Sequence, residues 1–295
     1  MRTRSLLSVL ALLLPLTAAA QTGDVRPELL RLINQERARV GAPPMRLSTP
    51  LGRAAQEHAG EIAGSGTFRL PGGSDKAMMA RIERVGYEAA EWAENVTHTT
   101  AGPQELMRDW KREAPNSYRQ LMDPAFVDLG IGVSRLKGMP LYTLLFAVPR
   151  GEQFARATAG LRDAERVRAA ILREVNEVRR REGLRPLVLD PLLNQAAQKH
   201  AQDMLARSYF AHESPSGTTV RERSRAQGYA WRSIGENIAE GQTTVDEVMQ
   251  TWMDSPGHRK NILSPKFTEL GVGLVVGGRA GAYRVLWVQN FGSPR

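Results

Sequence analysis

Three residues in the second half of the chain have side chains suited to metal binding or acid–base chemistry: His212, Glu236 and His258. They lie on three separate segments, each predicted to be a loop or the end of an element, where functional sites commonly form. Two neutral imidazoles and a carboxylate can hold a divalent ion such as Zn²⁺ with one position open for water, and a zinc-bound water can hydrolyse a substrate. The same side chains could instead form a hydrogen-bonded network that joins three segments without a metal.

The sequence offers no nucleophile of an established type beside these residues. It contains no cysteine and no Gly-x-Ser-x-Gly elbow. Ser214 and Ser255 lie near the two histidines in sequence, but each precedes a proline, and Ser-Pro is typical of a turn. We therefore do not expect a serine hydrolase.

The remaining histidines are predicted to be structural. His200 falls on the apolar stripe of a predicted helix, and His58 has the same place in the first half of the chain. Each is expected to be a core histidine with one hydrogen bond. His98 lies in a threonine-rich stretch and is expected to be an exposed loop residue. Asn237, directly after Glu236, is expected either to face a ligand or to cap backbone amides at a strand edge.

The elements that must position these side chains follow from hydrophobic spacing and from capping residues. The chain shows several segments with helical spacing of apolar residues and two runs rich in β-branched and aromatic residues, which are typical of strands. This order of elements favours a small antiparallel sheet flanked by helices. In chain order we expect an amphipathic helix over 162–182, a helix opened by Asp190 and Pro191, a loop over 209–218, a short helix over 219–227, a helix from Thr243 and Thr244 through Trp252 that ends at Ser255-Pro256-Gly257, and strands over 270–276 and 283–291.

The two halves of the chain are copies of one another. A shift of 142 residues aligns them, and it becomes 141 after one inserted residue. So many identities in one register predict two tandem domains, over 24–150 and 161–295, joined by a short linker over 151–160. The matching pairs include Arg37 with Arg179, His58 with His200, Arg81 with Arg223, Glu94-Asn95 with Glu236-Asn237, Trp110 with Trp252, and Gly130-Ile-Gly with Gly271-Val-Gly.

The N-terminal residues 1–20 have the three parts of a secretory signal peptide. Arg2 and Arg4 precede an apolar run from Leu6 to Leu16, and Ala18-Ala19-Ala20 fits a cleavage site. The run is shorter than the ~20 residues that cross a membrane, so we expect cleavage and no transmembrane segment afterwards. The alternative is an uncleaved interfacial anchor. The mature protein is expected to be secreted or periplasmic.

The composition excludes several other classes. The chain has 295 residues, is 42% hydrophobic and 24% charged, and has no cysteine, which excludes disulfide scaffolds and Cys-ligated metal sites. Its net charge of +9 is spread thinly among acidic residues, whereas a nucleic-acid footprint is a concentrated basic patch. We therefore expect no nucleic-acid partner.

The motifs of the second copy closely resemble the CAP superfamily, which contains cysteine-rich secretory proteins, antigen-five allergens and plant pathogenesis-related proteins, and most of all its cysteine-free bacterial branch. The first copy resembles it more faintly. The resemblance implies two tandem α-β-α sandwich domains, each with a small antiparallel sheet, and it implies secretion. The motifs are His212-Glu-Ser-Pro-Ser-Gly, Gly235-Glu-Asn-Ile-Ala, Trp252-Met-Asp-Ser-Pro-Gly-His258-Arg-Lys-Asn-Ile and Trp287-Val-Gln-Asn-Phe-Gly.

The resemblance further implies a cleft lined by two histidines and acidic residues. Carried over, these are His212, His258 and Glu236, whereas the position of the family's second glutamate holds Ser255, with Asp254 beside it. The first copy is degenerate, because its register sets Leu70 against His212 and Ser117 against His258. Any metal or acid–base chemistry is therefore expected in the second copy alone.

Three functions remain open from the sequence. The first is an exported, non-catalytic binding module for an extracellular or envelope ligand, such as a lipid, a cell-wall fragment or a protein. The second is a hydrolase that uses Zn²⁺ or another divalent ion held by His212, Glu236 and His258. The third is a structural envelope protein whose two copies pack together. No cofactor is required by the first and third, and the sequence indicates neither the ligand nor the oligomeric state.

Overall fold

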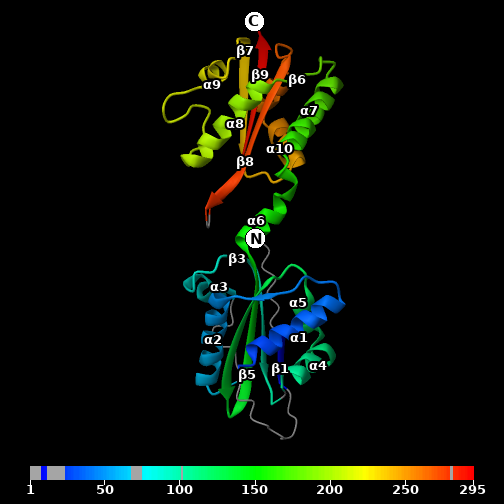
Figure 1. Cartoon of the computed structure of the whole chain (residues 1–295), viewed down its shortest axis with the longest axis vertical. Coiled ribbons are helices and arrows are strands. Elements are labelled where there is room, and N and C mark those ends of the chain that lie inside the picture. The colour runs from blue at the N-terminus through cyan, green and yellow to red at the C-terminus, as the bar shows by residue number, and fades with distance from the viewer. Residues whose placement is uncertain (1–7, 12–23, 68–74, 101, 280–281) are drawn as a thin grey trace. The chain divides into compact units, whose positions relative to one another are not determined.

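A computed structural model describes residues 8–11, 24–67, 75–100, 102–279 and 282–295. The chain divides into two compact units, Met1–Gln153 and Phe154–Arg295 (Figure 1). The division falls inside the predicted linker 151–160, and that segment is helical: it holds most of α6 (Arg150–Ala157) and the start of a 3₁₀ turn (Ala159–Leu161).

The first helices of the second unit form where the sequence predicts them. Helix α7 (Ala164–Arg181) starts at Asp163, whose side chain accepts the N–H of Arg166. Helix α8 (Pro191–Ala206) starts at Asp190, which caps the N–H of Leu193. Each cap satisfies a backbone donor that the first turn of a helix leaves without a partner.

The later helices agree with the predictions except at one point. Helix α9 (Val220–Ala226) and helix α10 (Val245–Asp254) each begin with a capping box, at Thr219 and Thr244. Helix α10 ends at Ser255 as predicted, and a further helix that was not predicted, α11 (Pro256–Ile262), follows at once. Proline fits the first turn of a helix, where its missing N–H would have no partner in any case.

The sheet of the second unit has the strand order β6-β8-β9-β7. Strands β7, β8 and β9 pair antiparallel, and only the two-residue β6 pairs parallel. The strands are longer than the predicted runs, and β7 had no predicted bounds. Their ranges are β6 Val188–Leu189, β7 Trp231–Glu240, β8 Glu269–Arg279 and β9 Ala282–Pro294.

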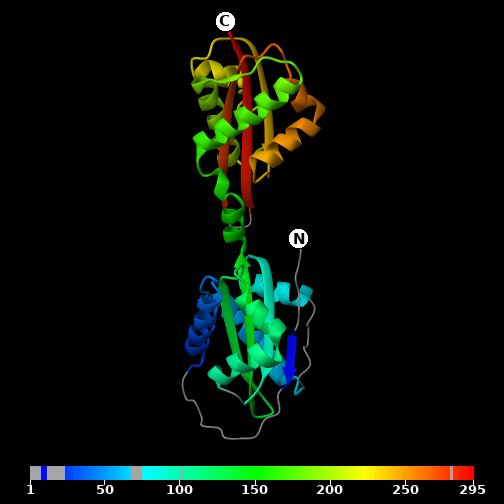
Figure 2. The same ribbon diagram turned by 90° about the vertical axis from the view of Figure 1, so that its right-hand side faces the viewer.

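Helices cover both faces of this sheet, so the expected α-β-α sandwich is present (Figure 2). On one face, Ala197, Ala201 and Met204 of α8 pack on Leu286 and Val288. On the other face, helices α7, α10 and α11 form the larger core cluster with the alternate residues of β9. Within that cluster, Trp252 and Trp287 meet edge to face, with ring centroids 6.5 Å apart.

Helix α8 lies directly on β8 because two glycines of that strand have no side chain. A Cβ atom at Gly271 would lie 2.2 Å from the backbone carbon of Leu193, and one at Gly273 would lie 2.2 Å from that of Ala197. Gly130 and Gly132 approach helix α2 (Thr49–Gly64) of the first unit in the same way. The Gly-x-Gly motif shared by the two copies therefore sets the distance between helix and sheet.

The first unit repeats this plan in a sheet of order β1-β3-β5-β4-β2. Strands β3, β4 and β5 pair antiparallel, as in the second unit. The elements are β1 Ser8–Ala11, α1 Arg26–Arg39, β2 Arg46–Leu47, α2 Thr49–Gly64, α3 Asp75–Arg84, β3 Ala89–His98, α4 Pro103–Glu113, α5 Pro115–Met122, β4 Asp128–Leu136 and β5 Met139–Pro149.

The predicted signal peptide lies mostly outside the residues that the structure describes. Four residues of the predicted signal peptide, Ser8–Ala11, form a strand that pairs parallel with β3, and the other residues of 1–20 lie outside the described part of the chain. The signal peptide stays a prediction. Within the described ranges, no helix is long and apolar enough to cross a membrane.

The expectation of an exposed loop at His98 is wrong, because this residue is buried at the end of β3 with Nε2 2.8 Å from the carbonyl oxygen of Leu136.

Candidate functional site

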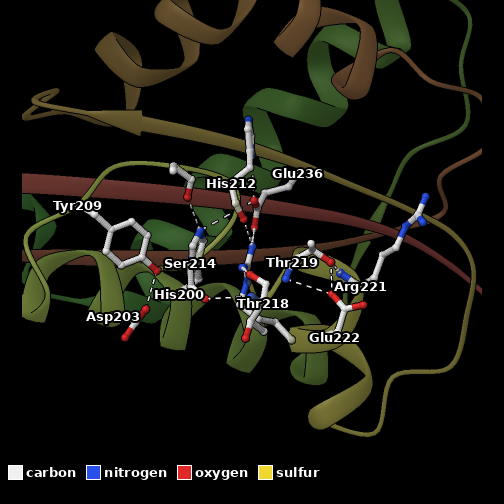
Figure 3. Close-up of polar contacts among 12 residues, drawn as sticks. His200, Asp203, Tyr209, His212, Ser214, Thr218, Thr219, Arg221, Glu222 and Glu236 are labelled. Atoms are coloured by element: carbon white, nitrogen blue, oxygen red, sulfur yellow. Dashed lines mark hydrogen bonds and ion pairs between the residues drawn. The ribbon is translucent and has the colours of Figure 1, made fainter. Parts of the chain in front are cut away.

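The carboxylate of Glu236 is the centre of a polar cluster in the second unit (Figure 3). Glu236 lies in β7 with only 3% of its side chain exposed. Its Oε1 is 2.9 Å from Nδ1 of His212, and its Oε2 accepts a 2.6 Å hydrogen bond from the guanidinium of Arg223. Two of the three residues predicted from the sequence therefore meet, and each oxygen of the carboxylate has a partner.

Arg223 connects this carboxylate to the loop that carries His212. Its guanidinium donates to the carbonyl oxygen of Thr218 at 2.7 Å and to that of His212 at 3.0 Å, and its side chain is 10% exposed. Hydrogen bonds from a charged donor are stronger than neutral ones. No role was predicted for Arg223, although its identity with Arg81 in the repeat is a signal that the position matters.

His200 lies beneath this pair on α8. Its Nε2 is 3.0 Å from the carbonyl oxygen of Ala211 and 3.9 Å from Oε1 of Glu236. Burial lowers the pKa of His200, which favours the neutral ring. Tyr209 lies on the other side of the ring and donates to Asp203 at 2.5 Å. His200 is thus a buried histidine with a backbone partner, as predicted, and it supports the base of the loop.

Asn237 fixes the backbone that carries His258. Its Nδ2 donates to the carbonyl oxygen of His258 and to Oε1 of Gln289, both at 3.1 Å. Asn261 of α11 donates in turn to Oδ1 of Asn237 at 2.9 Å. These amides join β7, β9 and α11, so Asn237 orders the site and does not present its amide to solvent.

The ring of His258 is half-buried beside this network. Its Nδ1 is buried and has no hydrogen-bond partner within the described residues. Burial is the main cause that lowers the pKa of His258, and the charge of His212 lowers it further. A positive charge on His212 therefore disfavours a proton on His258.

This arrangement predicts that the second domain loses stability on acidification. The unfolded chain binds a proton at His258 near the ordinary pKa of 6.5, whereas the folded chain binds it only at lower pH. The unfolded state then carries more protons, so stability is full above about pH 6.5, falls as the pH drops from there to the folded pKa, and levels off below it. His200 acts in the same direction. Urea unfolding of the second domain between pH 7.5 and 4.5 checks the trend.

NMR titration of the imidazole signals separates the two causes of the His258 shift. The pKa of His258 is expected to rise in His212→Ala, which removes the repelling charge, and to stay below 6.5 because burial remains. An exposed control, Glu213→Ala, is expected to leave it unchanged. A His258 signal that titrates at or above 6.5 in the wild type would contradict this description.

Asp254 and Ser255 have local partners in the structure. Asp254 is exposed at the end of α10 and accepts a hydrogen bond from Gln250 at 2.8 Å. Ser255 is the half-buried N-cap residue of α11. Ser214 has its hydroxyl against Ser216 and the N–H of Thr218, which is the turn predicted for it.

The predicted metal ligands His212, Glu236 and His258 are not gathered as a set of three. Within the described part of the chain, no set of three or more His, Asp or Glu side chains is placed to hold an ion. At Glu236, the oxygens face Nδ1 of His212 and the cation of Arg223. A metal at the remaining lone pairs of this carboxylate would lie beside that cation, which repels it.

The first unit contains the same glutamate in a simpler setting. Glu94 is 2.8 Å from Nδ1 of His58, the counterpart of His200, and both side chains are buried. Arg81 pairs with Glu61. Asn95 donates to the carbonyl oxygen of Ser117, as Asn237 does to that of His258. The first copy thus keeps the asparagine bond of Asn95 and a glutamate–histidine contact, but its arginine pairs with a different glutamate. It has a serine where the second copy has His258, and its Leu70 lies outside the described residues.

Comparisons with known proteins agree with this fold. The sequence matches the family described as "CAP: Cysteine-rich secretory protein family" twice, over residues 30–144 and 172–291. It is 42% identical over 116 residues to the uncharacterized protein YkwD of Bacillus subtilis (strain 168), covering 39% of this chain and 43% of that protein.

Solved structures give similar matches. An extracellular protein of Bacillus anthracis that contains an SCP domain is 27% identical, with a TM-score of 0.39, covering 52% of this chain and 53% of that one. An outer surface protein of Borrelia burgdorferi is 20% identical, with a TM-score of 0.40, covering 45% of this chain and 96% of that one. The chain spans about half or less of the length of YkwD and of the Bacillus anthracis protein.

Proposed function

The chain belongs to the CAP family of cysteine-rich secretory proteins, as a cysteine-free member with two tandem domains, and on this premise we propose that it is an exported, non-catalytic binding module. Its second domain would hold a polar ligand of the cell envelope or the extracellular space at His212 and His258. The first domain keeps the fold and lacks the second of these histidines, so it is a structural or binding companion of the second.

The observation that carries this proposal is that the Glu236 carboxylate is buried and bonded to neighbouring side chains. Both of its oxygens are paired, to His212 and to Arg223. These contacts use two of the about four lone-pair sites of the carboxylate, and its burial together with the adjacent Arg223 cation opposes an ion or a substrate at the others. The imidazole of His212, by contrast, has 59% of its side chain exposed while its Nδ1 is held. The cluster therefore presents an oriented hydrogen-bonding group to solvent.

The exposed groups favour a hydroxyl-bearing ligand, such as a cell-wall glycan fragment, over an apolar one. His212 offers its second ring nitrogen, and the half-buried His258 lies within range of its charge. Phe210, on the same loop as His212, is 44% exposed and offers an aromatic face. Imidazole nitrogens both donate and accept hydrogen bonds, which suits sugar hydroxyl and amide groups.

Calorimetry with chitohexaose, a soluble chain of N-acetylglucosamine, tests the proposal. We expect binding without release of shorter sugars, and a roughly tenfold weaker affinity in His212→Ala and in His258→Ala, as for one lost hydrogen bond each. Glu213→Ala, on the same loop, is the control and is expected to bind as the wild type does. Cleavage of the sugar that is lost in His258→Ala would refute the non-catalytic function. Binding to phosphatidylcholine vesicles with none to the sugar would refute the glycan class.

A further inference from the structure

The opposite side of helix α9 from the polar cluster carries a second group of arginines. Arg221 and Arg225 are one helical turn apart and therefore share a face, whereas Arg223, two residues from each, points inward to Glu236. In Figure 3, Arg221 extends away from the His212–Glu236 pair. Both outward guanidiniums lie over the indole of Trp231, with their central carbons 5.8 and 6.0 Å from the ring centroid.

A small cavity lies beside this stack. Its volume is about 230 Å³, and Arg225, Tyr229, Trp231 and Arg295 line it together with Gly228 and Ala230. Arg295 is held there, because its backbone N–H donates to the carbonyl oxygen of Ala230 and its Nε to that of Trp231. A water molecule takes up about 30 Å³ in the liquid, so the cavity has room for a polyatomic group.

Arginines outnumber acids around this cavity among the described residues. Arg221, Arg225 and Arg232 are all exposed. Glu222, on the same helix, bonds to the N–H and hydroxyl of Thr219 and attracts Arg225. Glu269, behind Tyr229, accepts the tyrosine hydroxyl at 2.5 Å. The two guanidiniums beside one indole repel each other. An anion bound between them would offset this repulsion.

The fold does not require these cations. In the register of the repeat, the first domain has Met79 and Glu83 at the places of Arg221 and Arg225. It has Ala89 at the place of Trp231 and Ala90 at that of Arg232. The first domain therefore forms the same helix and strand with a methionine, an acid and two alanines at these places. The arginines and the indole are additions specific to the second domain.

We propose that this arginine–tryptophan cavity binds the phosphate group of an anionic ligand. Guanidinium groups match the paired oxygens of a phosphate with two parallel hydrogen bonds, and stacking on an indole holds their planes in place. The site lies on the far face of α9 from His212, so it is separate from the polar-ligand site proposed above and does not depend on it. The phosphate belongs either to a soluble polymer or to a lipid headgroup.

Binding of sodium tripolyphosphate to the full chain at low ionic strength, followed by indole fluorescence and calorimetry, tests this site. We expect a dissociation constant below ~1 mM, a fluorescence change that disappears in Trp231→Phe, and affinity about tenfold or more lower in Arg221→Ala/Arg225→Ala. The charge-preserving pair Arg221→Lys/Arg225→Lys is expected to lie in between, because lysine has no planar fork.

The matched control removes two exposed arginines of α7, in Arg166→Ala/Arg173→Ala, and is expected to bind as the wild type does. An equal loss in this control would show diffuse charge and overturn the proposal, as would no binding of tripolyphosphate together with no binding of phosphatidylglycerol vesicles. Tripolyphosphate binding alone supports a soluble source, and binding to phosphatidylglycerol but not phosphatidylcholine vesicles supports a headgroup. Unchanged thermal unfolding of the double variants shows that a loss of affinity is not a loss of fold.

Discussion

Replacing Arg179 by methionine is expected to lower the free energy of unfolding of the second domain by about 3–5 kcal/mol. Arg179 is 1% exposed, and its guanidinium donates to four backbone carbonyls. Those of Arg185, Ile262 and Ser264 are 2.8 Å away, and that of Phe267 is 3.4 Å away. One side chain thus ties the end of α7 to the segment that follows α11. Methionine fills much of the volume and leaves all four carbonyls without this donor.

Thermal unfolding with limited proteolysis measures the loss domain by domain. The second domain is expected to melt about 10 °C earlier, while the first stays intact. Arg37→Met is the mirror experiment, because Arg37 donates to the carbonyls of Pro43, Leu121, Asp123 and Phe126 in the first domain. Arg180→Met is the matched surface control, since Arg180 is exposed and its ion pair is with Glu177 at the surface of the same helix. A loss as small as that of Arg180→Met would contradict a structural role for Arg179.

The repeat made much of the fold predictable from one sequence. Local signals were sufficient where a nearby side chain accepts the free backbone N–H groups at the start of a helix. Asp190 and Thr244 do this at the starts of α8 and α10. They were insufficient at Pro256, because proline stops one helix and suits the start of another, and only tertiary contacts decide. His98 was mistaken for a loop residue because its strand, β3, is buried on both faces and therefore lacks polar alternation.

The candidate site was predictable in its exposed residues and not in its support. The motif chemistry indicated His212 and Glu236, which are in contact. It could not indicate Arg223, because an arginine on a short helix is usually a solvated residue and its burial depends on where that helix docks. The same limit applies to Asp254, whose side chain turns along its own helix to Gln250. Residue type suggests which chemistry is possible, whereas pairing decides which atoms are free to perform it.

Replacing Glu236 by alanine is expected to destabilise the second domain by about 3–5 kcal/mol. The change leaves the guanidinium of Arg223, which is 10% exposed, without its carboxylate, and it releases Nδ1 of His212. An unpaired buried charge costs more than the net value of the pair. Amide hydrogen exchange over residues 209–219 is therefore expected to accelerate in Glu236→Ala, because the loop loses its anchor while α8 and the sheet stay folded.

A double-mutant cycle distinguishes the loss of the Glu236–Arg223 attraction from the cost of leaving the Arg223 cation buried without a partner. Arg223→Met removes the cation, so Glu236→Ala/Arg223→Met is expected to be about 1–2 kcal/mol more stable than the sum of the single changes predicts. Glu240→Ala, further along the same strand, is the control: Glu240 pairs with Arg284 nearer to solvent, and its loss is expected to cost at most about 1 kcal/mol. If the two single changes simply add, the carboxylate and the guanidinium do not act as a unit, and Glu236 would be free for a ligand or an ion.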